Sequence, residues 1–134
     1  MAGAFREVLA SGCTRVVIIG TDAPDLPADY LRRAFRALAE EGVDVVFGPS
    51  ADGGYYLLGL KSVPECLFEG IAWSTGTVLP ESLAKAEAEG LLVHLLPEWH
   101  DVDTAEDLQR CELVRAGNGA PLTREFVLRH IAGQ

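Results

Sequence analysis

The chain has little of what marks several special classes of protein. Its three cysteines, Cys13, Cys66 and Cys111, are far apart, with no CxxC pair, which argues against a zinc site or a disulfide framework. No apolar run approaches the roughly eighteen residues that a membrane-spanning helix needs. The first residues also lack the basic stretch and long apolar region of a secretory signal. We therefore expect a soluble, cytoplasmic protein without a membrane partner.

Basic residues are scarce as well. Eleven lysines and arginines stand against twenty acidic residues, which gives a formal net charge of −9. Such a charge repels nucleic-acid backbones, so we expect no nucleic-acid partner. A small anionic substrate remains compatible, because a divalent cation held by a few carboxylates reverses the local charge. The length of 134 residues suits a single domain, residues 1–134.

Apolar periodicity and turn residues divide the chain into alternating strands and helices. The continuous apolar run Val16–Ile19 is typical of a strand that is buried on both faces. The pattern predicts further strands at 43–48, 55–60 and 91–96, and helices at 4–11, 27–41, 80–89, 105–115 and 123–131. This order predicts an α/β fold with a mostly parallel sheet and an antiparallel strand near Asp52.

Asp22 is the first candidate for chemistry. It follows the first predicted strand in the segment GTDAPDLP, and ligands of open α/β sheets bind outside the carboxyl ends of the strands. A carboxylate in this place can hold Mg²⁺ or Mn²⁺, which in turn neutralises a diphosphate. The alternative is an aspartate that only caps the following helix.

Two further segments carry acids in turns. In ADGGYY, paired glycines let a substrate approach the backbone while Asp52 accepts hydrogen bonds from hydroxyl groups, although a plain β-turn between strands fits equally. In HDVDTAEDL, Asp103 is a candidate second metal ligand. Alternatively, Asp101 and Asp103 only favour the positive end of a helix. His100 lies beside these acids, whereas His94 alternates with apolar residues and is expected to be structural.

Four ordered segments together resemble the DUF2064 family over nearly the whole chain. They are VVIIGTDAPDLP, GPSADGGYYLLGL, FEGIAWSTGTVL and DVDTAEDL. The family is glycosyltransferase-like and related to 2-phospholactate guanylyltransferase and to molybdenum-cofactor nucleotidyltransferases. The resemblance implies a three-layer, GT-A-like fold of the nucleotide-diphospho-sugar transferases.

The same resemblance implies roles for residues. Asp22 would be the catalytic, metal-binding acid and Asp103 the second metal ligand. Asp52 would be a catalytic group on the acceptor side. The substrate-binding residues would be Gly53, Gly54, Tyr55, Trp73, Ser74 and Thr75.

The resemblance fails at the amino terminus. Similar proteins begin with a strand and a loop containing Gly and Lys or Arg that grips the nucleotide, and MAGAFREVLASGCT has no counterpart. We therefore expect an N-terminally shortened fold or a protein without that grip. The sheet edge left open would be covered by dimerisation or strand exchange.

These observations leave three functions open. The first is a metal-dependent transfer of a glycosyl group from a nucleotide diphosphate sugar to a small acceptor. The second is a nucleotidyltransferase that acts on a phosphorylated metabolite. The third is a non-catalytic binding or assembly domain, or a truncated fragment.

Overall fold

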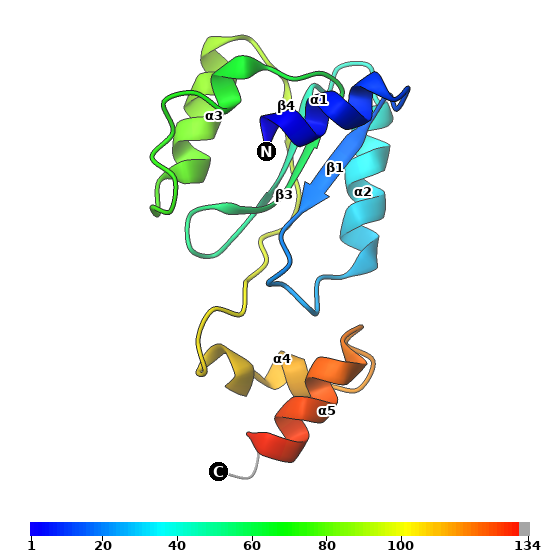
Figure 1. Ribbon diagram of the computed structural model, residues 1–134, viewed down its shortest axis with the longest axis vertical. Coiled ribbons are helices and arrows are strands. Elements are labelled where there is room, and N and C mark those ends of the chain that lie inside the picture. The colour runs from blue at the N-terminus through cyan, green and yellow to red at the C-terminus, as the bar shows by residue number, and fades with distance from the viewer. Residues whose placement is uncertain (132–134) are drawn as a thin grey trace.

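The computed structural model describes residues 1–131 as an α/β protein built on a four-stranded sheet (Figure 1). The helices are α1 (Ala2–Ala10), α2 (Ala28–Ala39), α3 (Val78–Ala88), α4 (Cys111–Val114) and α5 (Pro121–His130). The strands are β1 (Val16–Ile19), β2 (Val45–Pro49), β3 (Tyr55–Leu60) and β4 (Val93–Leu95). Two short 3₁₀ helices, η1 (Glu65–Leu67) and η2 (Asp107–Gln109), complete the chain. The predicted α/β class is confirmed.

The sheet is mixed, with the strand order β1-β3-β2-β4. β3 pairs antiparallel with β1 and with β2, whereas β2 and β4 are parallel. Strands β1, β2 and β4 thus share one direction, and the antiparallel strand predicted near Asp52 is β3. The carboxyl ends of β1, β2 and β4 therefore lie at the same edge of the sheet as the amino end of β3 and the loop before it.

Helices cover both faces of the sheet. On one face, Phe5 of α1 and Ala86 of α3 pack with Phe47 of β2 in one apolar core. On the other, α2 contributes Ala34, Ala37 and Leu38 to a second core with Val46 of β2. The neighbours Val46 and Phe47 point to opposite faces because side chains alternate along a strand. This explains why the strands read as continuous apolar runs.

The predicted helix over residues 105–115 is wrong. The chain forms only η2 and the four-residue α4, with Arg110 between them in an extended conformation (φ −63°, ψ 135°). The backbone N–H and the Nε of Arg110 both donate to the carbonyl of Asp107. The extended ψ of Arg110 keeps the N–H of residue 111 out of the hydrogen bond that a continuous helix would make to that carbonyl, so the helix stops after one turn.

The bounds of β1 and β3 agree with the prediction, and the other boundaries differ by a few residues. The predicted strand 91–96 contracts to β4, and the predicted helix 123–131 begins earlier, at Pro121. Figure 1 shows α4 and α5 beyond the carboxyl end of β1, away from α1 and α3. Within residues 1–131, no helix has the length and apolar character needed to cross a membrane.

Candidate functional site

Acidic side chains gather at the carboxyl edge of the sheet. Asp22 follows β1, Asp52 follows β2, and Asp101 and Asp103 follow β4. Carboxylate oxygens of Asp52, Asp101 and Asp103 all lie within 4.8 Å of one another. We call these three residues the acid cluster. Its position agrees with the rule that ligands of α/β sheets bind outside the carboxyl ends of strands.

Backbone hydrogen bonds hold the segment after β4 in place. Trp99 donates its N–H to the carbonyl of Pro49 and accepts from Ala51 N–H, each at 2.9 Å. Further along, the N–H of Val102 donates to the carbonyl of Asp22 at 2.7 Å. The chain that carries Asp101 and Asp103 is thereby tied to the ends of both β2 and β1.

Asp101 is the most constrained member of the acid cluster. Burial raises the pKa of its carboxyl group, and the charges of Asp22, Asp52 and Asp103 raise that pKa further. A hydrogen bond from Ser50 Oγ to Asp101 Oδ2 (3.2 Å) opposes this rise. The other oxygen, Oδ1, is buried and accepts no hydrogen bond from the described residues. Like charges and an unpaired buried oxygen are the conditions that a cation would relieve.

Asp22 lies beside the acid cluster without being one of its three members. It is close enough for its charge to act on the pKa of Asp101. Gly20 makes room for it, because a Cβ at that position would lie 2.8 Å from Asp22 Oδ1. The structure thus brings Asp22 and Asp103 to one edge of the sheet, but it groups Asp103 more closely with Asp52 and Asp101.

The loop between β2 and β3 forms a tight turn. Asp52 Oδ1 accepts the N–H of Gly54 at 3.0 Å. Gly53 has φ +91°, and a Cβ there would lie 2.1 Å from the carbonyl oxygen of Gly76. The loop therefore docks directly onto the segment Trp73–Gly76, and only glycine fits at position 53.

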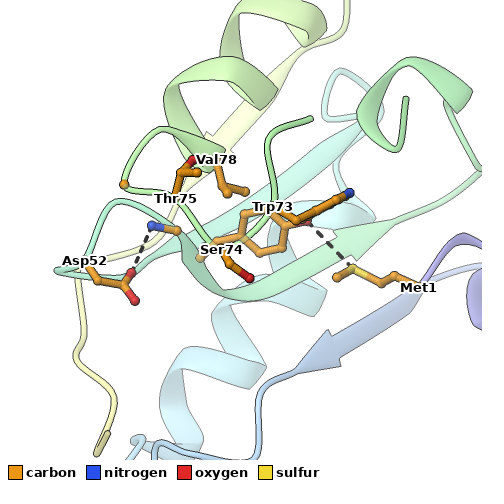
Figure 2. A pocket seen from close by; sticks show the side chains of 9 residues that line it. Met1, Asp52, Trp73, Ser74, Thr75 and Val78 are labelled. Carbon is orange, nitrogen blue, oxygen red and sulfur yellow. Dashed lines mark hydrogen bonds between the residues drawn. The ribbon is translucent and has the colours of Figure 1, made fainter. Parts of the chain in front are cut away.

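A cavity of about 410 Å³ opens beside this contact (Figure 2). Of the residues predicted to bind substrate, Gly54, Tyr55, Trp73, Ser74 and Thr75 line it, together with Asp52, Met1, Gly76 and Val78. Gly53 is not among the lining residues, but it contacts Gly76, which is one of them. Three sequence segments thus converge on one cavity, and the binding role of these residues remains a prediction.

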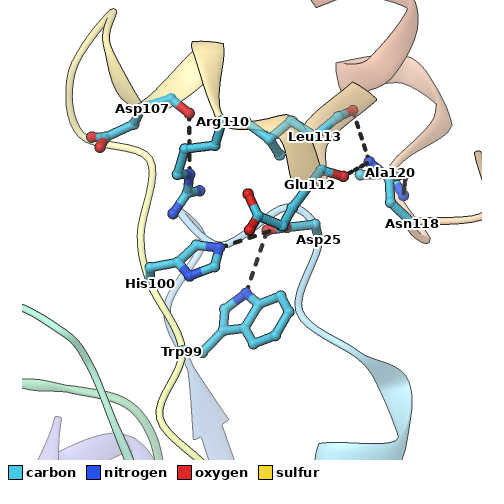
Figure 3. Close-up of polar contacts among 9 residues, drawn as sticks. All are labelled: Asp25, Trp99, His100, Asp107, Arg110, Glu112, Leu113, Asn118 and Ala120. Carbon is cyan, nitrogen blue, oxygen red and sulfur yellow. Dashed lines mark hydrogen bonds and ion pairs between the residues drawn. The ribbon is translucent and has the colours of Figure 1, made fainter. Parts of the chain in front are cut away.

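A second polar cluster lies around Asp25 (Figure 3). The Asp25 side chain is 2% exposed; its Oδ1 accepts a hydrogen bond from Trp99 Nε1 at 3.4 Å, and its Oδ2 lies 3.7 Å from His100 Nε2. The rings of Trp99 and His100 stack with centroids 4.6 Å apart. His100 therefore contacts a buried carboxylate, while the next residue, Asp101, enters the acid cluster.

The sequence did not single out Asp101 as a ligand or Asp25 at all. The sequence suggested for Asp101 only that it favours the positive end of a helix, but the predicted helix does not form there. A usable signal was the spacing of Asp101 and Asp103, because two residues apart in an extended segment share a face. Asp25 pairs across 74 residues, and no local pattern reveals such a contact.

The fold is that of a solved structure of similar sequence. A crystal structure from Desulfovibrio desulfuricans G20, described as a candidate nucleotide-diphospho-sugar transferase, matches with 34% identity and a TM-score of 0.79. The match covers 96% of this chain and 58% of that chain. The chain therefore spans somewhat more than half the length of this structural relative. No curated protein sequence matches it significantly.

The family follows from the sequence match. The model of the family described as an uncharacterized protein conserved in bacteria, DUF2064, matches residues 1–75, which is more than half of the 134 residues. The chain belongs to the DUF2064 family, as its four motifs predicted.

Proposed function

We propose that this chain acts in a metal-dependent transfer of a glycosyl group from a nucleotide diphosphate sugar to a small acceptor. The observation that supports it best is the position of Asp52, which belongs to the acid cluster and also lines the cavity. The proposed cation site and the proposed substrate cavity therefore share one carboxylate. The fold of the Desulfovibrio relative supports the same class of reaction.

The acid cluster fits a hard divalent cation. Its members offer carboxylate oxygens, which are the ligands that Mg²⁺ and Mn²⁺ prefer. Asp101 and Asp103 would hold the cation from the β4 side and Asp22 from the β1 side. Such a cation, when bound, would neutralise the diphosphate group as negative charge grows on it.

Asp52 has the acceptor-side role in this proposal. The acceptor hydroxyl oxygen forms a bond to the anomeric carbon while the bond from that carbon to the diphosphate breaks. The hydroxyl proton passes to the Asp52 carboxylate, and the nucleoside diphosphate leaves. The hydrogen bond from Gly54 N–H to Asp52 Oδ1 fixes the carboxylate and leaves Oδ2 for the proton.

Metal and donor binding test the proposal. Calorimetric titration with Mn²⁺, followed by a panel of nucleotide sugars, is compared for the wild type, Asp101→Asn and Asp22→Ala. Glu106→Gln is the matched control, since it removes one exposed acid from the same segment. We expect metal-dependent binding of one donor class that is weakened about tenfold or more in Asp101→Asn and in Asp22→Ala and retained in the control. Equal binding by all four proteins would refute the cation site.

The product distinguishes this proposal from the second open function. Release of a nucleoside diphosphate from a sugar nucleotide supports glycosyl transfer, whereas release of pyrophosphate from a nucleoside triphosphate supports nucleotidyl transfer. A folded protein that binds neither metal nor nucleotide would favour the non-catalytic alternative.

A further inference from the structure

The cavity next to the acid cluster has an unusual charge distribution for a protein that handles phosphates. Asp52 is the only residue with a charged side chain among its described lining residues, and no lysine, arginine or histidine is among them. Asp101 and Asp103 lie just beyond Asp52 and add to the negative potential. A phosphate or carboxylate group beside Asp52 would therefore meet repulsion and no basic side chain, and the one cationic group carried by a described lining residue is the terminal ammonium of Met1.

The opposite wall of the cavity is apolar and aromatic. Trp73 remains 46% exposed, so its indole face is available to a ligand. Tyr55 and Val78 extend this surface. Burial raises the pKa of Tyr55 to about 12, so its phenol stays protonated and neutral at physiological pH. Figure 2 shows Trp73 and Ser74 between Met1 and Asp52.

The aromatic wall is held in place before any ligand arrives. Thr75 Oγ1 donates to the carbonyl of Ala72 at 2.7 Å, and the N–H of Ala72 donates to Glu81 Oε2. Ser74 adopts a left-handed conformation with φ 63°. Its hydroxyl makes no hydrogen bond to another group within residues 1–131. The wall thus offers a fixed apolar face and one available hydroxyl.

From this division we propose that the cavity binds the acceptor, and that the acceptor is an uncharged, hydroxyl-bearing ring such as a sugar or cyclitol. Its apolar ring face would lie on Trp73, and one hydroxyl would donate to Asp52. The term acceptor rests on the proposed glycosyl transfer, whereas the ligand class rests on the cavity alone. Because Asp52 also belongs to the acid cluster, that hydroxyl would stand where transfer takes place.

Binding without metal or donor tests the ligand class. The probes are methyl β-D-glucopyranoside and myo-inositol, with glucose 6-phosphate and uridine for comparison. The readout is the indole N–H signals of Trp73 and Trp99 in ¹⁵N-labelled protein, since the chain has two tryptophans. We expect a neutral ring to shift the Trp73 signal while the Trp99 signal stays, and glucose 6-phosphate to bind about tenfold more weakly.

Variants separate a true contact from a change in folding. Trp73→Ala should lower the affinity for the neutral ring by roughly tenfold, judged from the Tyr55 and Val78 resonances. Phe35→Ala is the control, because Phe35 is exposed to a similar degree, 40%, on α2. Ring binding is measured without metal or donor, so a failure of the metal site is distinguishable from a failure of this inference.

Three results would overturn the inference. One is tighter binding of glucose 6-phosphate or uridine than of either neutral ring. Another is an unchanged affinity in Trp73→Ala. The third is the absence of any Trp73 shift with both neutral rings at concentrations up to roughly 0.1 M, which exceeds the weak range of specific ligands.

Discussion

The acid cluster and the carboxylate of Asp25 are linked by neighbouring residues, since His100 contacts Asp25 and Asp101 belongs to the acid cluster, but their surroundings differ. The acid cluster gathers like charges at the surface, and its Asp101 Oδ1 has no described partner. Asp25, in contrast, is buried against Trp99 and His100. The acid cluster brings several like charges together, whereas Asp25 has one hydrogen bond and one ion-pair contact, although His100 Nε2 also makes no hydrogen bond to the described residues. We therefore expect the acid cluster to serve ligand binding and Asp25 to stabilise the fold.

Addition of a divalent cation should produce the largest effect. A ligand that binds only the folded state at a hundredfold excess over its Kd stabilises by about 2.7 kcal/mol. We therefore expect saturating Mn²⁺ to raise the melting temperature of the wild type, measured by calorimetry. Asp101→Asn should lose most of this gain, and Asp25→Asn should keep it. If Mn²⁺ raised the melting temperature of Asp101→Asn by a similar amount, the acid cluster and Asp25 would not differ in cation binding.

Removal of the Asp25 side chain should have the next largest effect. Asp25→Ala leaves Trp99 Nε1 without its acceptor and His100 without its carboxylate, at an expected cost of about 2 kcal/mol. Urea unfolding measures this. The control is Asp29→Ala, which removes an exposed ion pair with Arg33 (3.1 Å) and should cost less than about 0.5 kcal/mol. If Asp25→Ala and Asp29→Ala lowered the free energy of unfolding equally, Asp25 would not hold the segment with Trp99 and His100 in place.

The smallest expected effect is a gain in stability on substitution, where Asp25→Ala gives a loss. The pKa of Asp101 is raised in the folded protein, so the folded state binds its proton more tightly than the unfolded chain does. Stability contributed by the protonated form is present at low pH and lost as the pH rises through the raised pKa. Asp101→Asn should therefore stabilise the metal-free protein at neutral pH, by less than about 1 kcal/mol because the site is half-exposed.

Denaturant unfolding of metal-free protein at several pH values checks this last prediction. The difference between Asp101→Asn and the wild type should shrink toward acid pH, where the wild-type carboxyl is protonated. A difference that stays constant with pH would mean that charge repulsion in the acid cluster is not its cause.

Strand positions and the first acid could be predicted because their signals are local. The bounds of β1 and β3 agree with the runs Val16–Ile19 and Tyr55–Leu60. The end of β1 places Asp22 at the sheet edge, and the motifs identify the family. The DUF2064 resemblance also named most of the residues that line the cavity. These features depend on short segments, which the sequence displays directly.

The failures depend on tertiary contacts. Local hydrogen bonds do form at the start of the predicted helix 105–115, since Asp107 Oδ2 accepts from both the N–H and the hydroxyl of Thr104. The helix nevertheless ends, because the backbone of Arg110 is extended (ψ 135°) and turns the chain out of the helical path. Asp101 then lies in an extended segment whose course is set by β2 and by Asp22. Capping signals predict where a helix can begin, but not how far it continues.

The contact of Gly53 with Gly76 has a consequence for the distance between the two walls of the cavity. Since a Cβ at position 53 would collide with the Gly76 carbonyl, any larger residue there would push the loop that carries Asp52 away from residues 73–76. The width of the cavity is therefore set by a contact between two backbones, and no side chain can adjust it.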